Sequence, residues 1–202
     1  MLVLCLVVFG ALMGCGGSEV EYYPKPRGFL RMDFPDRVFE SYQSNCPFVF
    51  EMPDYFKIDE KPGSCNRNIQ ISRFNATLFI TYLPVDTNLV YNVEYSRKLA
   101  YEHNIRADAI EESVVKDPER KVYGLKYNIK GDAASQYQFY LTDSVSNFLR
   151  GALYFNSAPN YDSLRPSLEY VVQDIDHIIE TLEWKESSLD SNAVDGLQVV
   201  SP

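Results

Sequence analysis

Residues 163–184 constrain the fold most, because apolar side chains recur there at helical spacing without a break. The apolar positions are Leu168, Val171, Val172, Ile175, Ile178, Ile179 and Leu182. The other side of this helix carries Glu169, Gln173, Asp174, Asp176, Glu180 and Glu183. Ser163 is placed to cap the N-terminus, and Pro166 is tolerated in the first turn. A helix with one apolar face has to bury that face, so we expect it to lie across a sheet.

The segments before this helix are typical of short strands with one further helix. Each expected strand is rich in aromatic or β-branched residues and is bounded by Pro, Gly or Asn. The expected strands cover residues 48–51, 68–74, 76–83, 109–115, 121–130, 135–141 and 147–155. The expected helix covers residues 89–104, with Ser96, Leu99, Ala100 and His103 on one face.

This order of elements predicts an α+β fold: an antiparallel sheet with packing helices, arranged as a two-layer or αβα sandwich. The order is similar to that of the Mog1/PsbP-like fold. A likeness of fold alone carries no function, so the function has to be argued from other features.

The first 14 residues contain no charged residue and are almost wholly apolar, as in a secretory signal peptide. They are too few to span a bilayer, which takes roughly 20 apolar residues. The sequence then runs Leu12-Met13-Gly14-Cys15, which resembles the lipobox of bacterial lipoproteins. The resemblance implies cleavage before Cys15 and a lipid attached to its sulfur, which anchors the protein on a membrane. The alternative is an ordinary secretory signal in which Cys15 has no role.

Composition indicates one globular domain with a tether and a tail. The chain is 46% hydrophobic, 14% aromatic and 23% charged, which suits a packed core. We expect a signal peptide over residues 1–14, a lipid-anchored tether over 15–45, one α+β domain over 46–185 and a disordered tail over 186–202. The net charge of −9 disfavours binding to nucleic acid or anionic headgroups, so membrane attachment depends on the acyl chains.

The expected tether contains a short basic and aromatic cluster. Tyr23, Lys25 and Arg27 are interleaved with prolines that favour an extended chain. The cluster either docks a partner or is a spacer whose aromatic side chains pack on the domain.

Two of the four cysteines remain for the mature domain, because Cys5 leaves with the signal and Cys15 takes the lipid. An exported protein meets an oxidising compartment, so we expect Cys46 and Cys65 to form a disulfide. Closing a loop of about 20 residues stabilises a domain by roughly 3 kcal/mol. The alternative is a pair of buried free thiols.

Residue spacing predicts no catalytic, cofactor or metal site. His103 shares the apolar face of its helix and is expected to be a buried structural residue. His177 lies three residues after Asp174, and two ligands without a third make a weak metal site. Ser144 has neither the flanking glycines of a nucleophile elbow nor a base beside it. No phosphate-binding glycine loop is present, and a hydrolase that uses a pair of carboxylates stays open.

Several blocks of sequence together resemble one family, the gliding-motility lipoprotein GldD of Bacteroidetes. The blocks are Tyr23-Pro24-Lys25-Pro26-Arg27-Gly28, Cys46-Pro47-Phe48, Leu99-Ala100-Tyr101-Glu102-His103, residues 141–166, and Glu180-Thr181-Leu182-Glu183-Trp184. They span nearly the whole mature domain. The resemblance implies a non-enzymatic component of the gliding and type IX secretion machinery, with no cofactor and no small-molecule substrate.

The resemblance also implies a periplasm-facing position in the cell envelope, with the outer membrane favoured over the inner, and partners among the other gliding and secretion proteins. Two alternatives come from other classes: an envelope hydrolase acting on glycan or peptidoglycan, and a ligand-binding lipoprotein with a large apolar pocket. Asp143-Ser144 and Asp162-Ser163 look like short O-glycosylation motifs of exported Bacteroidetes proteins, and glycosylation at either is left open.

Overall fold

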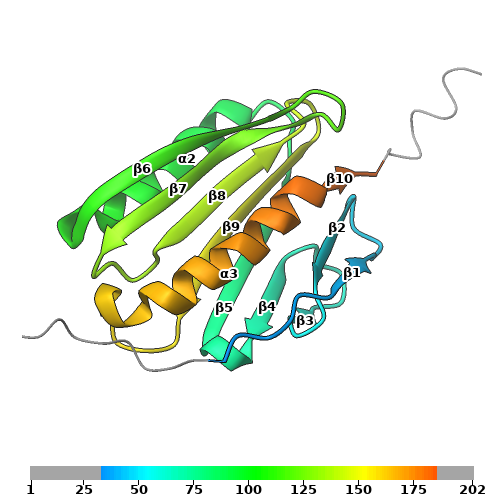
Figure 1. Ribbon diagram of the computed structural model, residues 1–202. Coiled ribbons are helices and arrows are strands. Elements are labelled where there is room, and N and C mark those ends of the chain that lie inside the picture. Colours follow the sequence, from blue (N-terminus) through cyan, green and yellow to red (C-terminus); the bar gives the residue numbers. More distant parts are fainter. Residues whose placement is uncertain (1–32, 186–202) are drawn as a thin grey trace, which may run out of the picture. The chain divides into compact units, whose positions relative to one another are not determined.

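The computed structural model describes residues 33–185 (Figure 1). The predicted signal peptide, Cys15, the cluster of Tyr23, Lys25 and Arg27, and the predicted tail over 186–202 lie outside the described residues. The helices are α2 (Leu89–Tyr101), α3 (Tyr161–Thr181) and two 3-10 helices, η1 (Ser72–Phe74) and η2 (Glu102–Ile105). The strands are β1 (Phe39–Tyr42), β2 (Phe48–Pro53), β3 (Lys57–Glu60), β4 (Arg67–Ile71), β5 (Ala76–Pro84), β6 (Ala107–Asp117), β7 (Val122–Gly131), β8 (Tyr137–Thr142), β9 (Asn147–Phe155) and β10 (Glu183–Trp184).

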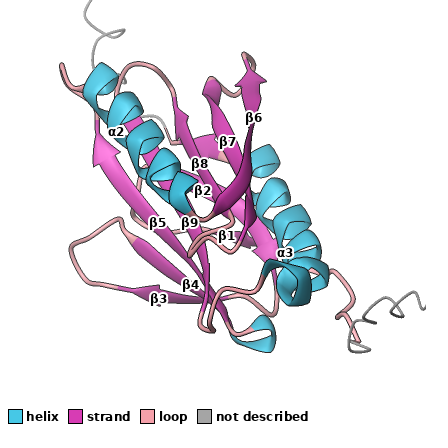
Figure 2. Cartoon of the chain, turned by 90° about the vertical axis from the view of Figure 1, so that its left-hand side faces the viewer, coloured by secondary structure: helices cyan, strands magenta, loops and turns pink. Residues whose placement is uncertain are grey.

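Seven strands form one antiparallel sheet in the order β3-β4-β5-β9-β8-β7-β6. Its centre is the β8–β9 hairpin, which pairs Tyr137 with Leu153 and Thr142 with Phe148. Every residue of β8 is buried, because α2 and α3 lie on opposite sides of the sheet at this point (Figure 2). The fold is therefore an αβα sandwich, and the predicted α+β class with an antiparallel sheet is confirmed.

Helix α3 covers one face of the sheet with the predicted apolar stripe. Five residues of α3 are at most 3% exposed: Leu168, Val171, Ile175, Ile178 and Ile179. Leu182, which follows the helix, is equally buried. The helix begins at Tyr161, and the Asn160 side chain accepts a hydrogen bond from the Ser163 backbone N–H at 3.1 Å. The cap is therefore Asn160, and the prediction that Ser163 caps the helix was wrong.

A second, three-stranded sheet in the order β1-β2-β10 lies beside α3. It forms because the chain returns after α3 and pairs Trp184 with Phe48. Phe48, Phe50 and Tyr42 of this small sheet join the same hydrophobic core as the α3 stripe. The strands close the side of the sandwich along which α3 runs (Figure 1).

Helix α2 covers the other face over a smaller core. Its buried residues are Asn92, Ser96 and Ala100, spaced four apart, and only Ala100 joins an apolar cluster. The members of that cluster are Ala100, Tyr127, Ile129, Ala133, Tyr140 and Phe148. The helix ends at Tyr101, so His103 lies in η2 and not on the helix face where it was expected.

The folded domain starts before residue 46. Residues Phe39–Tyr42 form β1 and pair with β2, with Tyr42 opposite Phe50, although the sequence placed them in the tether. The strand expected over 68–74 ends at Ile71 and continues as η1, which closes with Asn75 at φ 50°. Strand β3 was also missed, because only one of its four residues is even partly buried and short exposed strands leave no apolar pattern.

Candidate functional site

The predicted disulfide between Cys46 and Cys65 is present, with the two Cα atoms 5.5 Å apart. It joins the turn before β2 to the loop before β4. The disulfide lines an open depression of about 620 Å³ between residues 43–46 and residues 60–67. The alternative of two free thiols is thereby excluded.

A buried arginine holds the same corner together. Arg67 is 4% exposed, and its Nε donates to the Tyr42 hydroxyl at 2.6 Å. Its Nη1 donates to the carbonyl oxygens of Ser64 and Asn66, and its Nη2 lies 2.9 Å from Cys46 Sγ. Each of its three nitrogens therefore has a partner, and the guanidinium serves to fix the disulfide loop.

Among the described residues, the charged side chain buried most deeply is Asp174 on α3, which is 0% exposed. Sequence placed Asp174 on the solvent side of the helix, and that placement was wrong. Arg37 Nε donates to Asp174 Oδ1 at 2.6 Å, and the Tyr55 hydroxyl donates to Oδ2. Burial raises the pKa of Tyr55, and the hydrogen bond to Asp174 raises it further. Both oxygens of the Asp174 carboxylate therefore accept hydrogen bonds from residues far away in the sequence: Tyr55 is 119 positions before Asp174, and Arg37 is 137 positions before it.

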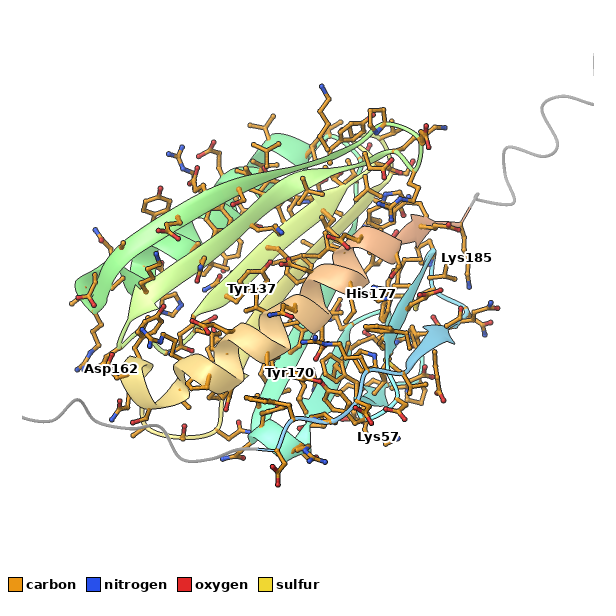
Figure 3. The ribbon with its side chains drawn as sticks, in the orientation of Figure 1. Lys57, Tyr137, Asp162, Tyr170, His177 and Lys185 are labelled. Atoms are coloured by element: carbon orange, nitrogen blue, oxygen red, sulfur yellow. A yellow bond between two sulfur atoms is a disulfide. The ribbon has the colours of Figure 1, made fainter. Side chains whose placement is uncertain are left out.

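These contacts attach the start of the described chain to α3. The Arg37 guanidinium stacks on the Tyr170 ring at 4.0 Å, and the Tyr170 hydroxyl donates to the Pro35 carbonyl. Phe34 stacks on the same ring at 4.6 Å. Figure 3 shows Tyr170 and His177 on α3, with the N-terminal segment (blue) running beside the helix. The segment after residue 33 is therefore held by an ion pair and by aromatic contacts.

His103 lies in η2 and His177 lies in α3. Neither belongs to a group of side chains arranged to hold a metal ion among the described residues. His177 Nε2 lies 3.0 Å from Glu51 Oε2, and its ring stacks on Phe39 at 3.7 Å. Because Asp174 binds Arg37 and Tyr55, the pairing of Asp174 with His177 as metal ligands is not realised. Within residues 33–185 no group of three or more His, Cys, Asp or Glu side chains is arranged to hold a metal ion.

Asp143 and Ser144 build the turn between β8 and β9. Asp143 Oδ1 accepts hydrogen bonds from the backbone N–H groups of Val145, Ser146 and Asn147 at 2.8–2.9 Å. Burial acts to raise the pKa of Asp143, but the hydrogen bonds from Asn147, Val145 and Ser146 outweigh it and lower the pKa. Ser144 adopts φ 70°, in the left-handed region that such turns require. This serine has a structural place in the turn, next to an aspartate whose oxygens are occupied.

A glycosidase general acid needs a carboxyl group with a raised pKa. The pKa values of the Asp117 and Asp143 carboxyl groups are both lowered. At Asp117 the causes are the hydrogen bonds from Arg120, the backbone bond first. Both shifts run opposite to the direction that the hydrolase alternative requires.

A second open depression, of about 550 Å³, lies at the end of the β8–β9 hairpin where β10 passes. Its lining carries charges of both signs: Arg120, Lys121 and Lys185 with Glu119, Asp143 and Glu183. Arg120 is paired with Asp117 at 2.7 Å and donates to the Leu182 carbonyl. Neither depression is the large apolar pocket that a lipid-binding or drug-like ligand would need.

The described chain is thus a disulfide-linked αβα domain, of the kind that suits an oxidising compartment. None of its helices is long and apolar enough to cross a membrane. The family model described as Gliding motility lipoprotein GldD matches residues 19–184, and the chain belongs to this family. The family resemblance noted from the sequence blocks is therefore confirmed. As a lipoprotein family, it implies a lipid anchor and a place in the cell envelope.

One solved structure that the chain is similar to is the solution structure of cyanobacterial PsbP (CyanoP) from Synechocystis sp. PCC 6803. The two share 9% sequence identity, with a TM-score of 0.48, over 77% of this chain and 97% of that one. With this low identity and TM-score, the likeness indicates nothing about the function of this chain. No curated protein matches the chain.

Sequence reasoning missed Arg37, Tyr55 and Arg67. Each lies in a loop or short strand without a recognisable motif, and each is important because of a partner far along the chain. No local signal marks such residues, since an arginine that will be buried looks the same in the sequence as one that stays in solvent.

Proposed function

We propose that this protein is a non-enzymatic component of the gliding and type IX secretion machinery, held on a membrane by lipid on Cys15. The observation that carries the proposal is the family match over residues 19–184, which includes the domain and the segment before it. In this role the αβα domain binds other machinery components and the lipid keeps it at the membrane where they assemble.

The attachment of residues 33–37 to α3 supports a positioning role. An anchor restricts a domain only if the chain between them is short or is itself fixed to the domain. Arg37 is tied to the middle of α3, so residues 33–45 are part of the folded domain and not of the predicted tether over 15–45. Fewer residues than 15–45 then separate the lipid on Cys15 from the domain. We place the protein on the periplasmic side of the envelope, with the outer membrane favoured.

A clean deletion in the source bacterium, complemented from a plasmid, tests the proposal. Loss of colony spreading and of secreted surface adhesins is expected, with both restored by the wild-type chain. Cys15→Ser is expected to release the protein from the membrane fraction, whereas Cys5→Ser, as the matched control, leaves it anchored. Normal spreading and secretion in the deletion strain would contradict the proposal.

A further inference from the structure

One half of the sheet face on the α2 side has no helix over it among the described residues. Helix α2 packs on β8 and β9, and β3, β4 and most of β5 extend beyond it (Figure 2). Side chains of β5 alternate, with Leu78 and Ile80 in the core under α3 and Phe79 and Leu83 on the opposite face. Phe79 is 41% exposed and Leu83 is 36% exposed.

Aromatic side chains from three elements gather around this uncovered face. Phe79 packs edge-on against Tyr154 of the neighbouring strand β9, with the ring centroids 5.7 Å apart. On α2, Tyr91 and Tyr95 stack on each other at 5.8 Å and are 67% and 44% exposed. Exposed aromatic clusters of this kind are enriched at protein interfaces.

Arg150 of β9 lies in the middle of this surface without a carboxylate partner. Its side chain is on the α2 side, because Leu149 and Leu153 belong to the core under α3. Within residues 33–185 no acidic side chain forms an ion pair with it, although the whole chain has 28 acidic residues. Its one hydrogen bond runs from Nη2 to Gln138 Oε1 at 2.5 Å.

The groups around Arg150 are neutral or are donors. Burial lowers the pKa of Arg150, and the electrostatic neighbours that act against this effect are the phenols of Tyr154 and Tyr95. Gln138 is 1% exposed, and its amide Nε2 has no hydrogen-bond partner. Beyond its hydrogen bond to Gln138 Oε1, the guanidinium of Arg150 has lost part of its hydration, and no carboxylate of the described chain offsets that loss. A carboxylate from outside the domain that contacts the guanidinium would offset it.

We propose that Arg150 and the exposed side chains of Phe79, Leu83 and Tyr95 form a docking site for an acidic segment of a partner protein. An Asp or Glu of the segment pairs with the Arg150 guanidinium, and an adjacent apolar or aromatic residue packs on Phe79 and Leu83. The inference rests on the proposed function, since it supplies a surface through which an assembly component contacts another.

Charge complementarity selects this occupant. A chain of net charge −9 repels nucleic acid and anionic lipid surfaces strongly because these carry many negative charges, whereas a short acidic segment carries few and can place a carboxylate directly on the Arg150 guanidinium. A small free anion would use Arg150 but leave the aromatic surface uncovered. Arginine and tyrosine surrounded by apolar rim residues are also the residue types that dominate binding energy at interfaces.

The test is selection from a random heptapeptide phage library on the whole lipoprotein, purified in detergent and immobilised by a C-terminal tag. Enriched peptides are expected to carry Asp or Glu next to an aromatic or aliphatic residue. The best peptide is then synthesised with a fluorophore, beside a copy in which each carboxylate is replaced by its amide, and the Kd is measured by anisotropy. Both the amide copy and the Arg150→Met variant are expected to weaken binding at least tenfold.

The matched control is Arg97→Met, which removes one positive charge from the exposed side of α2, where Arg97 pairs with Glu112 at 4.0 Å. It is expected to change the Kd less than twofold. Phe79→Ser, at an exposed position, is expected to weaken binding at least threefold and covers the case in which Arg150→Met fails to fold. No enrichment of acidic peptides, or equal binding by Arg150→Met that folds normally, overturns the proposal. A dimer in sedimentation that Arg150→Met abolishes also overturns it, because the occupant is then a second copy of this chain.

The two proposals fail in different ways. If Arg150→Met abolishes peptide binding while cells carrying it spread and secrete normally, the docking site for an assembly partner is overturned and the proposed function stands. If the deletion strain itself spreads normally, the proposed function fails whatever the peptide does.

Discussion

Arg37 Nε lies 2.6 Å from Asp174 Oδ1, so an ion pair 137 residues apart in sequence fixes the N-terminal segment to α3. The aspartate is fully buried, whereas 31% of the arginine side chain is exposed. A buried carboxylate that loses its cation keeps its desolvation penalty and loses the attraction that offsets it. The arginine is therefore more important for stability than its partial exposure suggests.

We expect Arg37→Met to lower the free energy of unfolding by about 3 kcal/mol, as for one partner removed from a buried pair. The measurement is urea unfolding at pH 7, followed by tryptophan fluorescence, on a chain beginning at residue 16. Lys98→Met is the control, because Lys98 and Glu102 form an exposed pair at 4.0 Å; the expected change is less than about 0.5 kcal/mol. Equal losses for the two variants would contradict the argument.

The same pair shows what the sequence leaves undetermined. The helix around Asp174 could be predicted because its apolar residues repeat every three to four positions. On the helix surface Asp174 lies next to Val171 and Ile175, both 0% exposed, and a carboxylate there was assigned to the polar side by residue type. Its burial depends on Arg37 and Tyr55, and no pattern within the helix encodes a partner 119 or 137 residues away.

The strands follow the same logic. β5 and β9 were predicted almost to the residue, because both are long apolar runs that contain several aromatic or β-branched residues. β1 and β3 have four residues each, and only one of these eight residues is buried, so their pairing depends on neighbours and not on their own composition. Arg150 was not singled out for a related reason: its lack of a carboxylate partner is a property of the tertiary structure.

Reduction of the Cys46–Cys65 disulfide is expected to lower the free energy of unfolding by roughly 3 kcal/mol, since the bond closes a loop of 19 residues in sequence separation. The measurement compares urea unfolding with and without a phosphine reductant on the chain beginning at residue 16, which lacks Cys5 and Cys15. A Cys46→Ala, Cys65→Ala double variant is the control, because it should be insensitive to the reductant. A wild-type curve that the reductant leaves unchanged would show that the disulfide contributes little.

Two glycines of the sheet are expected to respond differently to alanine. A Cβ at Gly151 would lie 2.2 Å from the Phe139 ring, whereas a Cβ at Gly124 would lie 1.8 Å from the Tyr140 backbone oxygen. A side chain can move aside more easily than the backbone of a central strand. We expect Gly151→Ala to cost about 3 kcal/mol and Gly124→Ala at least as much.

The double variants separate the two causes. Phe139→Leu makes room beside Gly151, so in the Gly151→Ala background it should cost at least about 1 kcal/mol less than in the wild type. In the Gly124→Ala background the cost of Phe139→Leu should equal its cost in the wild type within about 0.5 kcal/mol. Thermal unfolding of the three single and two double variants, followed by circular dichroism, provides the comparison. Additive effects at both glycines would show that the Phe139 ring is not the obstacle.

Asp143 is expected to make the stability of the β8–β9 turn depend on pH. Burial alone would raise the pKa of its carboxyl, but the hydrogen bonds from Asn147, Val145 and Ser146 lower it below the unfolded value of about 3.9. A group whose pKa is depressed by folding adds stability above its unfolded pKa and loses it as the pH falls through the folded pKa. Asp143→Asn should therefore lower the free energy of unfolding by about 1 kcal/mol at pH 7, and the difference from wild type should shrink below about pH 4.

Urea unfolding of Asp143→Asn and wild type at pH 7, 5, 4 and 3 measures this dependence. Asp59→Asn serves as the control, because Asp59 is an exposed carboxylate on β3, outside the turn. The wild-type advantage over Asp143→Asn should be the same at pH 7 and pH 5, since both lie above the unfolded pKa. A difference that persisted unchanged to pH 3 would mean that the Asp143 side chain stabilises the turn by its shape and not by its charge.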